Sequence, residues 1–143
     1  MKTEKEISSL RNQDSRNEKK HFQDLIARIE KFSELEQDWD TYGSDKISLN
    51  SISSAIQIIK ISETDSIVID DAFPMRDGGV QLEKDFENHS IEIEVSPDNE
   101  ITLLVFDKES NLIFEKSFNV FETKDLINIV KDYYGNIHHS GKR

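Results

Sequence analysis

Apolar and polar residues alternate with a period of two from about residue 66 to residue 118, and this pattern constrains the fold more than any other feature of the chain. Side chains of a β-strand point alternately to the two faces of a sheet, so the alternation is typical of strands with one buried face. The turn-forming stretches "SPDNE" and "DKES" separate the runs. The pattern predicts an antiparallel meander of four strands, or five if "SIVID" forms an edge strand, whereas "DAFPMRDGG" is expected to hold no regular structure.

The register of the two central hairpins follows from their turns. A two-residue turn at Glu87-Asn88 places Leu82 opposite Ile93. A three-residue loop at residues 97–99 then sets Ile93 opposite Leu103. Both hairpins sort the apolar residues to one face and the acidic residues to the other, and this agreement supports the register.

Three further stretches carry apolar residues at steps of three and four, the spacing of an amphipathic helix. Their apolar positions are Phe22, Leu25, Ile26, Ile29, Phe32 and Leu35 in the first, Ile52, Ala55, Ile56 and Ile59 in the second, and Phe121, Leu126, Ile127 and Val130 in the third. Ser48 and Thr123 are the expected N-caps of the second and third helices, and Gly135 the expected end of the third. The β-branched residues of "IQIIKI" leave a strand there as an alternative.

This order of elements predicts an α+β fold, in which an antiparallel four- to five-stranded meander has two N-terminal helices and one C-terminal helix packed on one face. The length of 143 residues suits one hydrophobic core. We expect residues 1–20 to form a charged N-terminal extension, either helical or frayed, residues 21–135 a single α+β domain, and residues 136–143 a flexible tail.

Composition excludes several functional classes. The chain has no cysteine, which removes disulfides, thiol nucleophiles and cysteine-ligated zinc. No apolar run has the length of a signal peptide or a membrane span, so we expect a cytoplasmic protein. The formal net charge of -11 argues against direct binding to nucleic acids or anionic membranes.

The negative charge is concentrated in one region. Residues 65–100 carry eleven acids against two bases, a net charge of −9, whereas residues 1–31 carry six acids against eight bases, a net charge of +2. The acidic region includes the motif "DGGVQLE". That motif lacks the further glycines, the lysine and the following helix of a phosphate-binding loop. We expect its glycines to let the chain turn sharply into a strand, under Trp39 or Tyr42.

No catalytic arrangement is evident, so the sequence favours a protein that is not an enzyme and needs no cofactor. The four histidines lie in polar or turn contexts, and no serine or aspartate pattern near them indicates a triad. "HHSGKR" is typical of a loose tail rather than of a metal site.

One acidic cluster nevertheless needs a reason. The register places Glu83 opposite Glu92 and Gln81 opposite Glu94 on the face away from the apolar residues, and like charges directly opposite destabilise a sheet. Apolar side chains on the same face are Leu104, Phe106 and Ile113. Four interpretations compete: a solvated face relieved by bases from elsewhere in the fold, a docking face for a basic protein, a site for magnesium or calcium, and a paired-carboxylate hydrolase.

Two separated patterns resemble those of a group of small bacterial proteins. That group shares a W-D-x-Y-G loop with a helix that begins after "IS", and a G-G-[IV]-Q-L-E strand followed by an E-I-E-I strand and a P-D-G-type turn. Across residues 35–105, the matching positions are Trp39, Asp40, Tyr42, Gly43, Gly78, Gly79, Gln81, Leu82, Glu83, Glu92 and Glu94. Lys84 stands where tryptophan is usual, and Asn99 where glycine is usual. The resemblance implies a fold and a bacterial origin rather than an activity, and it implies that the glutamates form a unit with the tryptophan loop.

We therefore expect a non-enzymatic interaction module, similar to an antitoxin, immunity protein or defence accessory, that binds a basic protein such as a nuclease or toxin. The expected binding residues are Gln81, Glu83, Glu92, Glu94, Leu104, Phe106, Trp39 and Tyr42. A divalent-metal-dependent hydrolase or metal-regulated protein that uses the same carboxylates is the alternative, and a DNA-mimic inhibitor is a third hypothesis.

Overall fold

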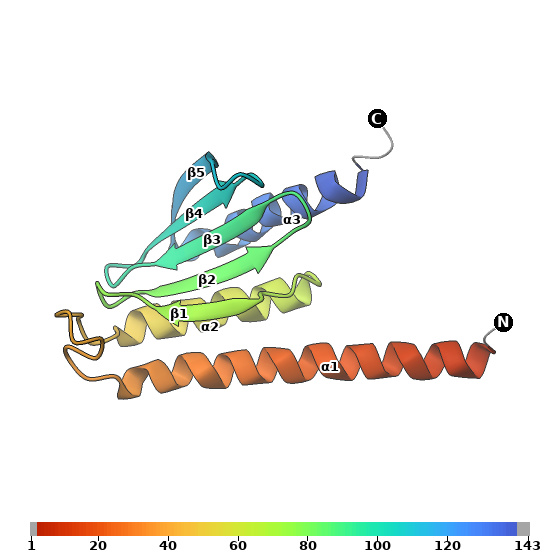
Figure 1. The fold of residues 1–143 in the computed structure, drawn as a ribbon, viewed down its shortest axis with the longest axis horizontal. Coiled ribbons are helices and arrows are strands. Elements are labelled where there is room, and N and C mark those ends of the chain that lie inside the picture. Colours follow the sequence, from red (N-terminus) through yellow and green to blue (C-terminus); the bar gives the residue numbers. More distant parts are fainter. Residues whose placement is uncertain (1–2, 140–143) are drawn as a thin grey trace.

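The computed structural model describes residues 3–139, apart from the side chains of residues 5, 7–14 and 134–139. Helices and strands follow one another in the predicted order, with two short 3-10 turns between them (Figure 1). Their bounds are α1 (Glu4–Glu30), η1 (Lys31–Glu34), α2 (Leu49–Thr64), β1 (Asp71–Pro74), β2 (Val80–Asp85), β3 (Ser90–Val95), β4 (Glu100–Phe106), β5 (Leu112–Asn119), η2 (Val120–Glu122) and α3 (Thr123–His139).

The strands form one antiparallel sheet in which each strand pairs with its neighbours in sequence. Leu82 lies opposite Ile93, and Ile93 lies opposite Leu103, which confirms the predicted register. The hydrogen bond from Phe86 N to His89 O, 2.8 Å long, closes the expected two-residue turn. The predicted α+β meander is therefore confirmed in its five-stranded form.

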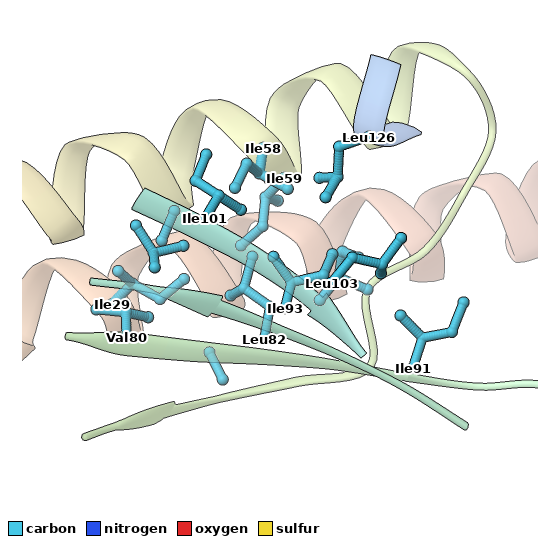
Figure 2. Packing of buried hydrophobic residues seen from close by; sticks show 14 of the residues in the cluster. Ile29, Ile58, Ile59, Val80, Leu82, Ile91, Ile93, Ile101, Leu103 and Leu126 are labelled. Atoms are coloured by element: carbon cyan, nitrogen blue, oxygen red, sulfur yellow. The ribbon is translucent and has the colours of Figure 1, made fainter. Parts of the chain in front are cut away.

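The helices cover one face of this sheet. α2 and α3 lie behind the sheet in the view of Figure 1, and α1 packs against α2 and along β1. Figure 2 shows the result: isoleucines and leucines from the strands meet Ile58 and Ile59 of α2 and Leu126 of α3. Burying one such side chain stabilises the fold by about 1.5–3 kcal/mol. Among the described residues, no helix covers the opposite face, which leaves that face available to solvent.

The first helix is longer than its apolar stripe. The stripe contributes the buried Leu25, Ile29 and Phe32, but the helix begins at Glu4, where Thr3 and Glu6 form a capping box. Of the two alternatives for residues 1–20, the helical one is observed from residue 4, and this part of α1 extends past the sheet (Figure 1). None of the helices in the described part of the chain is long and apolar enough to span a membrane.

The second predicted helix is also confirmed, and the alternative of a strand near "IQIIKI" is wrong. Ser48 occupies the N-cap position of α2, although its side chain makes no capping hydrogen bond. Ile58 is fully buried, whereas the predicted Ile56 is only half-buried. The buried face of α2 includes Ile58 together with Ala55 and Ile59, so the helix is rotated slightly from the predicted orientation, which placed Ile56 on that face.

The edge strand is displaced from its predicted position. It comprises Asp71–Pro74, inside the stretch that was expected to be irregular, whereas residues 67–70 of "SIVID" form no strand. Pro74 is tolerated because it ends an edge strand, where a missing N–H breaks no interior ladder. Ala72, opposite Leu82, supplies the strand's buried position.

The last helix differs from the prediction at both ends. Asn119 and Glu122, rather than Thr123, form the capping box, because η2 precedes α3. Thr123 instead donates its hydroxyl to Val120 O at 2.9 Å. The helix continues past Gly135 to His139, so residues 136–139 of the predicted tail are helical. Residues 140–143 lie outside the described residues.

Candidate functional site

The uncovered face of the sheet gathers most of the predicted binding residues. The register aligns one row across all five strands, Asp71, Glu83, Glu92, Leu104 and Glu115. It aligns a second row of Phe73, Gln81, Glu94, Thr102 and Ser117. Neighbouring strands lie about 4.8 Å apart, so Asp71, Glu83 and Glu92 are direct neighbours, whereas Leu104 separates Glu92 from Glu115. We call this surface, defined by Asp71, Phe73, Gln81, Glu83, Glu92, Glu94, Leu104, Phe106 and Glu115, the acidic face.

Basic side chains do not neutralise the centre of the acidic face. Within the described residues, no ion pair within 4.0 Å involves Glu83, Glu92 or Glu94. Glu83 accepts a hydrogen bond from the Gln81 amide at 2.9 Å, but that contact carries no positive charge. The negative charge is balanced at the edge of the acidic face, where Arg28 Nη1 lies 2.6 Å from Asp71 Oδ1.

The lysines of the neighbouring strand positions point to the other side. Lys84 lies opposite the buried Ile91, and its Nζ is 3.5 Å from Asp70 Oδ1. Lys116 lies opposite the buried Leu103, on the helix side of the sheet. In the described part of the chain, bases from elsewhere in the fold therefore pair with Asp71 at the edge but with none of Glu83, Glu92 and Glu94.

Two carboxyls of the acidic face, those of Glu92 and Glu94, have a raised pKa. Burial is the main cause of the raised pKa of Glu92, and the charges of Glu83 and Glu94 add to it. Burial likewise raises the pKa of Glu94, with smaller contributions from Asp77 and Glu115. A carboxyl whose pKa is raised by folding destabilises the fold when it is ionised, so this cost is present at neutral pH and is relieved as the pH falls through the raised pKa.

Glu92→Gln is expected to stabilise the protein by about 0.5 kcal/mol at neutral pH, because it removes a partly buried charge and its repulsion by the opposed Glu83 carboxylate. The gain should shrink as the pH falls toward the ordinary carboxyl pKa of 4.5, where the wild-type side chain becomes protonated as well. Thermal melts across this pH range measure the difference. Glu109→Gln, in the exposed turn after β4, is the control and should bring no gain. A gain for Glu92→Gln that persists in acid would contradict the electrostatic explanation.

Apolar side chains border the carboxylates. Leu104 and Phe106 are half-buried on β4, and Phe73 is partly exposed on β1. Leu112 and Ile113, each 48% exposed, lie at a β-bulge opposite Phe106. The bulge places two residues of β5 against one of β4 and so presents both side chains to solvent. The acidic face thus combines charge with an apolar margin.

The tryptophan loop, residues 35–48, forms a structural unit with the double glycine. Ser48 N donates to Gly78 O at 2.8 Å, and Gly78, with a φ of +92°, leaves no room for a side chain because a Cβ would lie 2.9 Å from Lys46 O. At Gly79 a Cβ would lie 2.5 Å from Val95 O. The absence of side chains at Gly78 and Gly79 therefore allows the backbones of Lys46 and Val95 to lie close to this segment. Gly78 lies against the backbone of Lys46 and Gly79 against that of Val95, and none of the atoms nearest to either built Cβ belongs to the predicted aromatic rings.

An arginine completes the attachment of this loop. Arg76 Nε lies 3.1 Å from Asp40 Oδ2, and its guanidinium also donates to the Tyr42 carbonyl. Asp40 in turn accepts hydrogen bonds from Tyr42 N and Ser44 N. A hydrogen bond with the Ser44 side chain is the main cause of the lowered pKa of Asp40, and these two backbone hydrogen bonds lower it further. The W-D-x-Y-G pattern is thus explained by loop structure: its aspartate holds the loop closed.

The two loop aromatics have different environments. Trp39 is half-buried, and its Nε1 donates to Asp45 O at 2.9 Å. Tyr42 is 77% exposed. Neither residue lies on the sheet, so these two predicted binding residues are not members of the acidic face.

The acidic face presents its carboxylates side by side on an open surface and does not gather them around one point. Among the described residues, no group of three His, Cys, Asp or Glu side chains is arranged to hold a metal ion. Carboxylates on a flat pleated surface cannot surround an ion as a loop does. What the acidic face provides is a broad negative potential next to exposed apolar groups.

Sequence reasoning missed several members of this surface. Glu115 escaped notice because "LIFEKSF" lacks a clean alternation, and the bulge is the reason. Asp71 and Phe73 were missed because the edge strand was predicted at residues 66–70, directly before the observed β1. Arg28 gave no signal, since its contact with Asp71 joins residues 43 positions apart.

Comparisons of the chain with protein-family models, with curated proteins and with solved structures find no match in any of the three. The functional proposal accordingly depends on the residues and their arrangement.

Proposed function

We propose that the protein is a non-enzymatic interaction module whose acidic face binds a basic protein partner. One observation carries the proposal: Glu83, Glu92 and Glu94 are held together on an uncovered sheet face without a basic side chain within 4.0 Å among the described residues. This arrangement costs stability in the free protein. Arginines or lysines of a partner would remove that cost on binding.

The surrounding chemistry supports a protein partner over other cationic ligands. Leu104, Phe106 and Phe73 offer apolar contact area that a simple ion or polyamine would not use. Complementary charge speeds association and fixes orientation, whereas the buried apolar contacts slow dissociation. A globular partner with a basic, partly apolar patch fits both features.

Among protein classes, small acidic partners that neutralise basic nucleases or toxins have this combination of charge and size. We place the protein with cytoplasmic antitoxin-like, immunity-like or defence-accessory subunits of bacterial origin. The support for this step is the net charge of -11 and the resemblance in the tryptophan loop and the G-G-[IV]-Q-L-E strand.

Reversing the charge of Glu83, Glu92 and Glu94 to lysine is expected to weaken partner binding at least about tenfold, because three attractive contacts become repulsive. The measurement is a pull-down from the native host at low and moderate salt, followed by affinity measurement on the partner identified. The control variant replaces Glu18, Glu63 and Glu109 with lysine. These three residues are exposed on other surfaces, and the control has the same net charge as the first triple variant.

Two results would count against the proposal. The first is a partner retained equally by the triple variant and the wild type, provided that circular dichroism shows the variant folded. The second is a melting temperature raised by magnesium, manganese or calcium in the wild type but not in the triple variant, which would favour the metal-dependent alternative.

A further inference from the structure

A groove of about 590 Å³ lies where the C-terminal end of α1 meets the tryptophan loop and the end of β1. Its walls are mainly apolar and its rim is charged. The lining residues are Asp24, Ala27, Arg28, Lys31, Phe32, Leu35, Trp39 and Pro74. A volume of this size accommodates one or two large side chains.

The groove is fixed before any ligand arrives. The Trp39 indole is held by its hydrogen bond to Asp45 O, and Asp45 N donates to Arg76 O at 2.8 Å. Phe32 is buried, so the opposite wall belongs to the core. A preformed groove loses little conformational entropy on binding, which favours its use as a pocket for an anchoring side chain.

Arg28 connects the groove to the acidic face. This side chain lines the groove, donates to Asp71 Oδ1 at 2.6 Å and lies 5.3 Å from the centre of the Phe73 ring. Asp71 is opposite Glu83, and Phe73 is opposite Gln81. The groove and the acidic face therefore meet at the edge of β1, with Arg28 as their shared boundary.

We infer that the groove receives an aromatic or branched aliphatic side chain from the same basic partner that the acidic face attracts. This inference rests on the proposed function and adds the partner's second recognition element. The acidic face supplies the salt-dependent attraction, and the groove supplies a desolvated anchor. A partner that wraps around the edge of β1 presents bases to Glu83 and Glu92 and its apolar side chain beside Trp39.

Two short synthetic peptides of alternating lysine and glycine test the inference, one with a central phenylalanine and the other with a central alanine. Anisotropy of the dye-labelled peptides gives affinity. Trp39 is the only tryptophan, so its emission reports occupation of the groove. We expect the phenylalanine peptide to bind about tenfold more tightly, equivalent to about 1.4 kcal/mol, and to shift this emission.

Ala27→Gln narrows the groove without changing charge and is expected to abolish the preference for phenylalanine. Ser53→Gln, on the exposed side of α2, is the matched control and should retain the preference. Equal binding of the two peptides to the wild type, or a preference that survives Ala27→Gln, overturns the groove inference and leaves the proposed function standing.

Two further outcomes are distinct from these. Failure of both peptides to bind at low salt, or binding unchanged by the Glu83, Glu92 and Glu94 reversal, contradicts the proposed function itself. Trp39 emission that changes with protein concentration in the absence of peptide would assign the groove to a second copy of the chain and overturn the inference.

Discussion

Gly79→Ala is expected to lower the free energy of unfolding by about 3 kcal/mol, because the new methyl group has no space. Its Cβ would lie 2.5 Å from Val95 O and 3.1 Å from Asp77 Oδ1. Val95 belongs to a central strand, and Gly79 O accepts a hydrogen bond from Met75 N at 2.9 Å. Neither backbone can move without breaking ladder hydrogen bonds, so the strain is not relieved locally.

Urea denaturation of the wild type and of two glycine variants measures this effect. Gly43→Ala is the control: Gly43 has a φ of +83° but no atom within 4 Å of a built Cβ, so it should cost only about 1 kcal/mol. A Gly79→Ala variant no less stable than Gly43→Ala would show that the entry to β2 is not packed as described.

The central hairpins were predictable because two independent constraints agree there. Turn length fixed which residues of β2 and β3 face each other, and alternation fixed which face is buried. The acidic cluster followed directly, since Glu83 and Glu92 are paired by the same register. Local sequence is sufficient to predict strand register where neighbouring strands are joined by tight turns.

Other elements depend on contacts that the sequence does not display. β1 pairs within "DAFP" because Ala72 fits opposite Leu82. A glycine inside a helix lowers the stability of that helix by only about 1 kcal/mol relative to alanine. Helix α3 therefore continues past Gly135 to His139. The groove beside Trp39 brings together residues of α1, η1, the tryptophan loop and β1, and no periodicity in the sequence indicates it.

The two motifs of the resemblance therefore have different explanations. The double glycine and Asp40 maintain loop and strand geometry, and their roles are accounted for by hydrogen bonds and close backbone approach. Glu92 and Glu94 have no such role, because folding raises the pKa of both carboxyls and Glu92 lies directly opposite Glu83, so that their negative charges oppose folding. Residues that oppose stability without a structural benefit are candidates for binding.

Leu103→Ala is expected to destabilise the protein by about 3 kcal/mol, whereas Leu104→Ala should cost less than about 1 kcal/mol. Leu103 is fully buried between the sheet and the helices (Figure 2). Leu104, the next residue, is half-buried on the acidic face. The two changes remove the same atoms from adjacent positions of one strand. The difference between their losses of stability therefore compares how deeply side chains are buried on the two faces of the sheet. Urea denaturation at neutral pH gives both values.

The same pair separates stability from binding. If Leu104 contributes to a partner contact, Leu104→Ala should weaken partner binding while it leaves the fold nearly intact, because the removed atoms lie next to Glu92 and Glu115. Leu103→Ala should lower stability without changing the affinity of the molecules that remain folded. Equal losses of stability would contradict the assignment of faces. A Leu104→Ala variant with full affinity would restrict the interface to the carboxylates and the groove.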